Sequence, residues 1–357
     1  MKHAVLAFAL FTIPASLFAQ GSLTPPGAPA PTMKSLDQLE ARTPITSVPY
    51  TISSPGSYYL SSNLTVTSGS AITITASQVT LDLNGFTISS TAASANGTGI
   101  LLAGGNADIT ILNGHIKGSV IYSGGGYSGP GFANGIYFSG SSPKNVRVSG
   151  VSVSGCSGYG IYLTLGDSTV VESCTVRTVG SYGIQANSVL RSTANQCGSV
   201  AMIAYIASDC YASSTGSQGF SAALSANNCY GLGSGSGIGL YAANAINCGG
   251  SSGSGQGLYA VTANNCQGQS GSGTGLYATQ TATGCYGYSA NDNGLVVIVA
   301  NNCIGQCNGS SYGLFVYQIA TGCYGSSVSG VGLSANIANS CFSSSGDFNI
   351  AHPYNMP

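Results

Sequence analysis

The cysteines are the first residues whose type and spacing could do chemistry. The chain has 12 cysteines, and most recur at one position of an internal repeat, with Ser192 taking that position once. A tetrahedral metal site needs thiolates that converge from different directions, whereas a single column of parallel side chains does not converge. We therefore expect no metal site, and the sequence indicates no cofactor. The column contains Cys174, Cys210, Cys229, Cys248, Cys266, Cys285, Cys303, Cys323 and Cys341.

Disulfides are the second chemistry open to these cysteines. Adjacent positions in such a column would lie about 4.8 Å apart with parallel Cβ vectors, whereas a bridge prefers a Cβ separation of roughly 3.8 Å. The column also holds an odd number of cysteines, so it cannot pair fully. We interpret them as free thiols that fill a narrow core. Cys303 and Cys307, which are close in sequence, are the candidate exception.

Acid–base chemistry would have to use the first half of the chain. After Arg191 the sequence contains no Lys or Arg, and its carboxylates there are widely separated. A polysaccharide lyase or glycoside hydrolase needs clustered carboxylates, together with a basic residue or calcium in the case of a lyase. If the protein is an enzyme, the candidate catalytic residues are Arg147, Asp167, Glu172 and Arg177.

The same charged residues also have a structural interpretation. Glu172 and Arg177 fall in one repeat and could form an ordinary surface ion pair. No catalytic motif matches residue by residue. The charge distribution therefore favours a protein without catalysis, and an enzyme is the alternative.

Tyrosines form the candidate ligand-binding surface. Tyr241, Tyr259 and Tyr277 each stand two residues after a repeated glycine, where an outward position is expected. A row of stacked rings stabilises neighbouring repeats. An exposed aromatic stripe can also stack on sugar faces or bind another protein.

The repeat predicts the elements that must position all of these residues. A Gly-aliphatic pair, with Ala201-Met as a degenerate member, recurs every 18 to 20 residues from Gly183 onward, and Ala-x-x-Cys follows it by nine or ten residues in the later repeats. In GLYATQTATGCYG the side chains alternate as in a strand, and a Gly/Ser-rich turn comes next. Short strands of this kind must stack on their neighbours. We predict a single-stranded right-handed parallel β-helix with about twelve coils, counted from Gly99.

The segments ISSPGSYYLSSNLTV, VTLDLNGFTIS and ITILNGHIKG, together with the Gly-Leu-Tyr-Ala and Cys-Tyr-Gly repeats, resemble secreted bacterial β-helix proteins of the pectin-lyase-like superfamily. The resemblance covers nearly the full chain and implies the fold. It implies no single function, since that superfamily includes lyases, hydrolases, epimerases, adhesins and scaffolds.

The ends of the chain read as processing and capping segments. We expect a signal peptide at 1–20, a Pro-rich linker at 21–32, an N-terminal cap at 33–60, the β-helix at 61–341 and a C-terminal cap at 342–357. A net charge of −1 and 5% charged residues give no footprint for nucleic acid. No segment after residue 20 is apolar for the length of a membrane span.

These observations combine into one functional hypothesis. We expect a non-catalytic, exported scaffold, secreted or held in the cell envelope, that binds a polysaccharide or a cell-surface protein through its flat outer faces. The alternative is a polysaccharide lyase or glycoside hydrolase with its site in the early coils.

Overall fold

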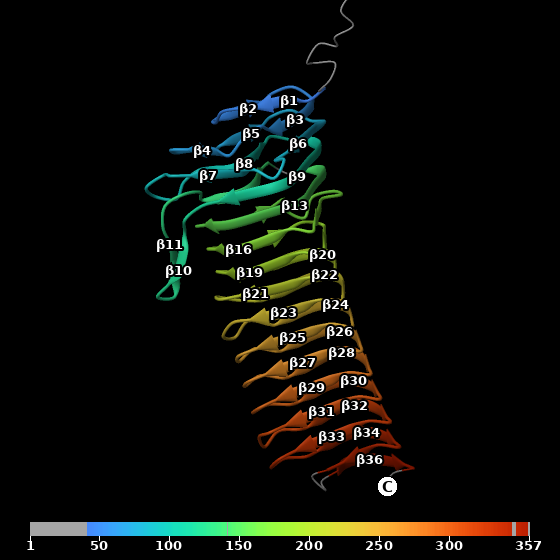
Figure 1. The fold of residues 1–357 in the computed structure, drawn as a ribbon. Coiled ribbons are helices and arrows are strands. Elements are labelled where there is room, and N and C mark those ends of the chain that lie inside the picture. The colour runs from blue at the N-terminus through green and yellow to red at the C-terminus, as the bar shows by residue number, and fades with distance from the viewer. Residues whose placement is uncertain (1–40, 141, 345–347, 356–357) are drawn as a thin grey trace, which may run out of the picture. The chain divides into compact units, whose positions relative to one another are not determined.

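The computed structural model describes residues 41–140, 142–344 and 348–355, and within these ranges every regular element is a β-strand. Residues Arg42–Pro357 form one compact unit. Its strands pair in parallel with those of the preceding and following coils and form three faces (Figure 1). The predicted parallel β-helix is confirmed. The predicted signal peptide and linker lie outside the described residues.

The first face holds the strands that follow each Gly-aliphatic anchor. Its early members are β2 (Tyr50–Ile52), β5 (Ile72–Ile74), β8 (Thr98–Ala103), β12 (Asn134–Ser139), β14 (Ile161–Tyr162) and β17 (Ile184–Gln185). Later strands cross the first face and bend onto the second: β20 (Met202–Ser208), β22 (Phe220–Asn227), β24 (Leu240–Ile246), β26 (Leu258–Asn264), β28 (Leu276–Thr283), β30 (Leu295–Asn301), β32 (Leu314–Thr321), β34 (Leu333–Asn339) and β36 (Phe348–Tyr354).

The second face begins with β1 (Thr43–Ile45), β3 (Gly56–Leu60), β6 (Val79–Asp82), β9 (Ala107–Lys117), β13 (Lys144–Cys156), β15 (Val170–Glu172) and β18 (Ser188–Leu190). It continues with the later halves of the strands from β20 to β36. Sixteen strands pair along this face, so the described part of the chain makes about 16 turns. The twelve coils counted from Gly99 are among them, and three earlier turns and one later turn add to that number.

The third face follows the cysteine corner. It consists of the later halves of β9 and β13 together with β4 (Leu64–Val66), β7 (Thr87–Ser90), β16 (Thr175–Val179), β19 (Thr193–Cys197), β21 (Tyr211–Ser214), β23 (Tyr230–Gly233), β25 (Gly249–Ser252), β27 (Gln267–Ser270), β29 (Tyr286–Ser289), β31 (Ile304–Cys307), β33 (Tyr324–Ser327) and β35 (Phe342–Ser343). One hairpin, β10 (Ile121–Ser123) with β11 (Gly126–Ser128), forms a separate two-stranded antiparallel sheet.

The corner between the second and third faces explains the Ala-x-x-Cys spacing. The residue before the cysteine has a left-handed backbone conformation, with φ of 51° at Asn228 and 61° at Gly284. Asn and Gly tolerate this conformation better than other residues do. The chain therefore turns between the alanine and the cysteine, as the sequence predicts.

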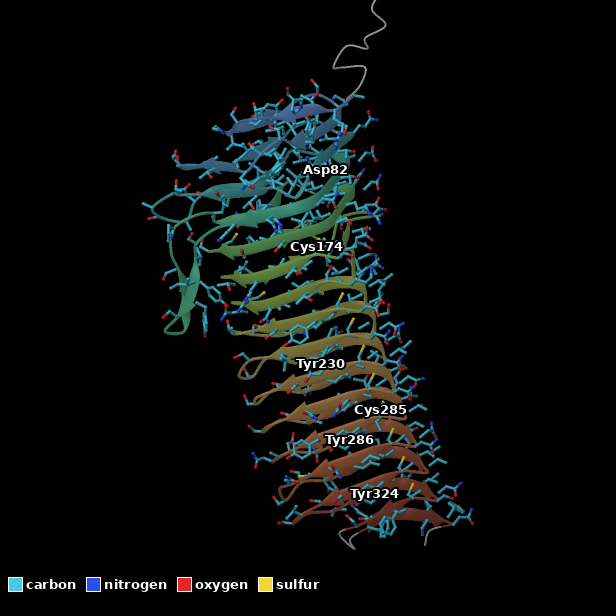
Figure 2. The ribbon with its side chains drawn as sticks, viewed as in Figure 1. Asp82, Cys174, Tyr230, Cys285, Tyr286 and Tyr324 are labelled. Atoms are coloured by element: carbon cyan, nitrogen blue, oxygen red, sulfur yellow. The ribbon has the colours of Figure 1, made fainter. Side chains whose placement is uncertain are left out.

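The cysteine column lies inside the coils. Cys266 and Cys285 are each 2% exposed, and Leu258 and Leu276 on the first face are fully buried. The cysteine column was predicted to fill the core, and that prediction is confirmed. Figure 2 labels Cys285 on this column of sulfur atoms. The Cys266 thiol donates to the carbonyl of Asn264 at 3.2 Å, and all 12 cysteines are free.

A second buried column explains the cysteines that fall outside the main register. Cys307 pairs with Ser289 and Ser327 on the third face, so it takes the position that serine occupies in neighbouring coils. Cys156 and Cys197 stand in the same column near its start. Cys303 therefore lies at the corner directly before β31, and Cys307 is the last residue of that strand. Four residues of extended chain separate their Cα atoms by about 13 Å, beyond the reach of a disulfide. The candidate exception to free thiols is wrong.

The β-pairing extends into both segments that the sequence assigns to caps. Strands β1, β2 and β3 lie within residues 33–60 and pair with later strands as ordinary coils. Strand β36 lies within residues 342–357 and pairs in parallel with β34 across both faces. Capping by residues 33–40 falls outside the described residues.

The hairpin β10–β11 is the largest insertion into the early coils. It runs beside the third face (Figure 1). The Tyr127 hydroxyl donates to the carbonyl of Gln196 at 2.9 Å and is 2.8 Å from the Thr215 hydroxyl. A Cβ built on Gly198 would lie 2.9 Å from the Tyr127 ring. The hairpin is thereby fixed over two successive coils.

Candidate functional site

The predicted tyrosine row is formed on the first face. Tyr241, Tyr259 and Tyr277 pair directly across β24, β26 and β28. Their rings stack with centroids 5.4 Å apart at both steps and with interplanar angles of 18° and 15°. All three side chains are partly exposed. The row therefore presents ring edges and hydroxyls to solvent.

The local sequence explains this arrangement. In each Gly-Leu-Tyr-Ala segment the leucine and alanine point inward and are buried, so the tyrosine between them points outward. Because the coils pair in register, every outward tyrosine meets the tyrosine of the next coil. Such ring pairs contribute about 0.5–1.5 kcal/mol beyond their buried area.

The row changes character after Tyr277. The next positions on the same line are Val296 on β30 and Phe315 on β32. A depression of about 310 Å³ opens at this point and is lined by Gln256, Thr274, Tyr277, Asn293, Val296, Tyr312, Phe315 and Tyr317. A second depression of about 340 Å³ shares Tyr277 and Tyr317 with the first. Together they hollow the first face beside the tyrosine row.

Sequence reasoning missed a second group of tyrosines on the first face. Tyr137 and Tyr162 pair on β12 and β14, and their rings stack 5.2 Å apart. Tyr159 and Tyr182 join them from the turns before the strands, at 4.5 and 6.5 Å from the Tyr162 ring. Burial raises the pKa of Tyr162. Tyr137 and Tyr162 also stand two residues after Gly135 and Gly160, so the glycine pattern could have identified them.

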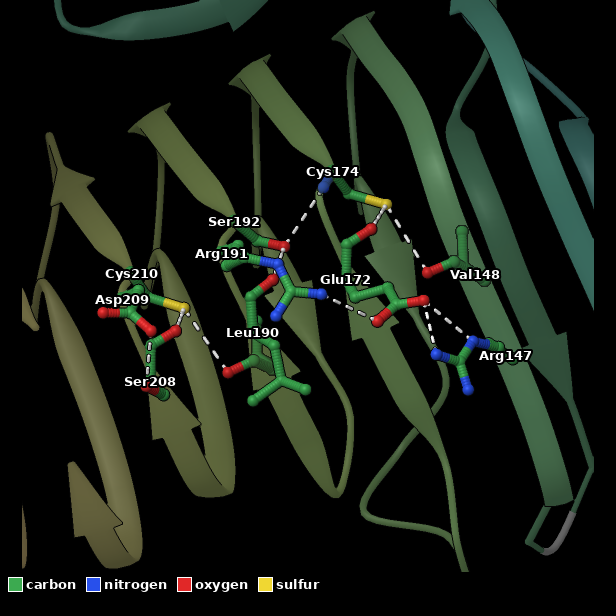
Figure 3. A network of polar contacts seen from close by, with 11 residues as sticks. Arg147, Val148, Glu172, Cys174, Leu190, Arg191, Ser192, Ser208, Asp209 and Cys210 are labelled. Carbon is green, nitrogen blue, oxygen red and sulfur yellow. Dashed lines mark hydrogen bonds and ion pairs between the residues drawn. The ribbon is translucent and has the colours of Figure 1, made fainter. Parts of the chain in front are cut away.

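The candidate catalytic residues are only partly brought together. Glu172 accepts hydrogen bonds from Nε and Nη2 of Arg147 at 2.9 and 2.5 Å, and from Nη2 of Arg191 at 3.1 Å (Figure 3). The two arginines come from the preceding and following coils. The Arg147 guanidinium is the main cause that holds the pKa of Glu172 below its usual value. The predicted pairing of Glu172 with Arg177 is wrong, because Arg177 lies beyond the corner on β16.

Asp167 does not join this cluster. It is exposed, its backbone bridges to Lys144, and its carboxylate accepts a hydrogen bond from Ser168 at 3.1 Å. Asp167 and Glu172 are at opposite ends of one rung, separated by five residues of the chain. Within residues 41–140, 142–344 and 348–355, no three metal-binding side chains gather at a point.

Comparisons with known proteins bear on the fold. The family model described as "Right handed beta helix region" matches residues 57–248. Among solved structures, the enzymatically active domain of tailspike protein 2 from bacteriophage CBA120 is 13% identical and has a TM-score of 0.27, covering 76% of this chain and 39% of that one. The full-length tailspike protein 2 from Escherichia coli O157:H7 bacteriophage CAB120 is 11% identical with a TM-score of 0.20, covering 88% and 37%.

This chain thus spans less than two fifths of each tailspike chain that it resembles. None of the curated proteins matches it.

Proposed function

Because this chain belongs to the right-handed β-helix family, we propose that it is a non-catalytic, exported scaffold that binds a glycan through the first face. The observation that carries the proposal is the stacked row of Tyr241, Tyr259 and Tyr277 beside an open depression. The regular spacing of this row suits a ligand that is itself a repeating chain.

The chemistry of the surface supports a neutral glycan. The outer face of the ring at the end of the row, Tyr277, can bind the C–H face of a sugar ring, the exposed ring edges can contact sugar C–H groups, and amides and hydroxyls bind sugar hydroxyl groups. Both kinds of group line the depression next to Tyr277, with Gln256 and Asn293 among them. The chain has no Lys or Arg after Arg191, so this region offers no cation for an acidic polymer.

Export is part of the same proposal. Its support is the sequence of residues 1–20, which has the basic start, apolar run and small final residue of a signal peptide. Among the described residues, no helix is long and apolar enough to cross a membrane.

The enzyme alternative has weaker support. A general acid needs a raised pKa, whereas Arg147 and Arg191 lower the pKa of Glu172. Both guanidinium groups are also engaged by that carboxylate, so neither is poised as a base. These contacts are those of a surface ion-pair cluster.

The experiment is a glycan array probed with the mature protein, with reducing-sugar and unsaturated-product assays on every glycan that binds. Replacing Tyr241, Tyr259 and Tyr277 together by Ser should weaken binding at least tenfold without unfolding the protein. Replacing Tyr211, Tyr230 and Tyr324 by Ser is the matched control, since these rings lie on the third face. That control should leave binding within about twofold.

The enzyme alternative makes the opposite prediction. If turnover is detected, survives the first triple change and disappears in Arg177→Ala or Glu172→Ala, the scaffold proposal is wrong.

A further inference from the structure

The line of outward rings on the first face has a gap at one rung. Tyr277 pairs with Val296, and Val296 pairs with Phe315, so a valine stands where the next ring of the row would be. Val296 is only 4% exposed and forms the floor between two larger side chains. The depression of about 310 Å³ lies over this floor.

The width of the gap suits one sugar ring. Strands two rungs apart are separated by roughly 9.6 Å. A pyranose chair that contacts an aromatic group on each side needs about 3.5–4.0 Å per carbon–carbon contact, or 7–8 Å plus the pucker of the chair, which roughly fills this separation. The Tyr277 ring is stacked on one side by Tyr259, and no other ring in the described part of the chain stacks on its side toward Val296. Its face there is available for such a contact.

The far wall of the gap is held in place by other rings. Phe315 packs edge-on against Tyr312 at 4.9 Å and against Tyr317 at 4.8 Å, with interplanar angles of 62° and 86°. These contacts fix the Phe315 ring from both sides. Both walls of the gap, Tyr277 and Phe315, are therefore held in place by neighbouring rings, so little side-chain conformational entropy is lost when a ligand enters.

Polar side chains at the edge of the depression are also held in position by hydrogen bonds. The Asp292 carboxylate accepts hydrogen bonds from the Thr274 hydroxyl at 2.9 Å and from the Asn293 amide at 3.0 Å. The Asn293 side-chain oxygen accepts the Tyr312 backbone N–H at 3.1 Å. Gln256, on the same rim, makes no side-chain hydrogen bond within the described part of the chain. The rim thus offers one uncommitted amide beside two positioned side chains.

We propose that a single neutral pyranose unit of a glycan inserts between Tyr277 and Phe315, over Val296, in the place of the missing ring. This inference rests on the proposed function, because it names where the glycan is gripped. The upstream tyrosines then contact neighbouring sugar units along the chain, and the gap supplies the one enclosed subsite. Asp292 acts as a positioning residue for Thr274 and Asn293.

The test fills the gap. Val296→Tyr restores the ring at a register where three preceding coils already carry tyrosine, so the fold should accept it. Binding is measured by titration and by saturation-transfer NMR, using neutral hexasaccharides of β-linked glucose, β-linked N-acetylglucosamine and α-linked mannose. We expect Val296→Tyr to weaken the hexasaccharide bound by the wild type at least tenfold. Val296→Ala, which keeps the gap open, should stay within about threefold.

Single changes along the row provide a second readout. Tyr277→Ser removes one wall and should weaken binding about as much as Val296→Tyr. Tyr241 lies two rungs away from Tyr277, so Tyr241→Ser should change the binding affinity less than threefold.

The outcomes separate this inference from the proposed function. If the triple tyrosine change abolishes binding but Val296→Tyr leaves it intact or tightens it, the flat row is the site and the inserted pyranose is overturned. If the wild type binds none of the hexasaccharides, both proposals fall. Wild-type binding of tetramethylammonium that Val296→Tyr abolishes, without saccharide binding, would show a cation cage instead and would also overturn the sugar assignment.

Discussion

Gly287 lies against the backbone of Gly294, so close that a Cβ built on Gly287 would be 2.2 Å from the Gly294 carbonyl oxygen. Gly287 is on the third face and Gly294 precedes a strand of the first face, so the two faces meet here backbone to backbone. The same approach recurs one coil earlier, between Gly268 and Gly275, at 2.2 Å. The glycines of the Gly-Leu-Tyr-Ala and Cys-Tyr-Gly motifs are therefore required by the narrow cross-section of the coil.

Gly287→Ala should destabilise the protein by about 1–3 kcal/mol, the usual cost of overpacking a tight core. The added methyl group would meet backbone atoms, which cannot rotate away. Gly253→Ala is the matched control, because its nearest neighbour, the Gly235 oxygen, is at 3.5 Å. Urea unfolding followed by circular dichroism measures both. Equal stability of the two variants would contradict the close approach of the faces.

Glu172 should make the stability of the early coils depend on pH. The pKa of its carboxyl is lowered in the folded protein, first by the hydrogen bond from Arg147. A lowered folded pKa means that the stabilisation is complete above the unfolded value of about 4.3 and is lost as pH falls through the lower folded value. Because Arg147 and Arg191 are 52% and 59% exposed, we expect no more than about 1 kcal/mol.

The measurement compares Glu172→Gln with the wild type by thermal unfolding from pH 7 down to pH 3. The difference between them should be largest at pH 7, shrink below pH 4 and decrease in high salt. Arg177→Gln serves as the control, because Arg177 makes no ion pair among the described residues, and its effect should not vary over this range. A difference for Glu172→Gln that is constant with pH would refute the ion-pair explanation.

The fold could be predicted from the sequence because the residue pattern of each repeat indicates the conformation of one coil. In GLYATQTATGCYG the inward residues, the corner and the tight glycine each stand at a fixed position, and repetition makes the pattern unmistakable. The turns before Gly99 are harder to count, since the loops between their strands vary in length. Strands β1, β2 and β3 lie in the segment that the sequence assigns to the N-terminal cap, and their parallel pairing with later strands becomes visible only in three dimensions.

The site was less predictable because it depends on register between coils. Glu172 and Arg177 are five residues apart, but the corner at Cys174 sends them to different faces. Arg147 is 25 residues away in sequence and yet donates two hydrogen bonds to Glu172. Likewise, the row from Tyr241 to Tyr277 is readable from the repeat. The depression beside it also needs Tyr312 and Tyr317, whose ring contacts with Phe315 appear only in three dimensions.

A serine should be able to replace a cysteine of the main column. Ser192 already occupies this column, where its hydroxyl donates to the Leu190 carbonyl at 2.8 Å and accepts the Cys174 N–H at 3.1 Å. The Cys266 thiol makes the same two contacts, with Asn264 and Cys248. Cys266→Ser should therefore cost less than about 1 kcal/mol, whereas Cys266→Leu should cost about 1–3 kcal/mol through overpacking. Urea unfolding that ranks the two variants the other way would contradict the role of this column.

The cysteines should be free but unreactive in the folded protein. Burial raises the pKa of Cys156 and of Cys197 to about 12, so almost none of either thiol is ionised near neutral pH. Because all 12 cysteine side chains are buried, at 0–4% exposed, iodoacetamide at pH 8 cannot reach them and should label very few cysteines in the native state. The same reagent, added after unfolding in guanidinium without a reductant, should label all 12. Mass spectrometry counts the adducts, and a sample reduced before unfolding gives the full-labelling control. Recovery of five or six disulfides from the unreduced sample would show that the columns are bridged and would overturn their interpretation as core.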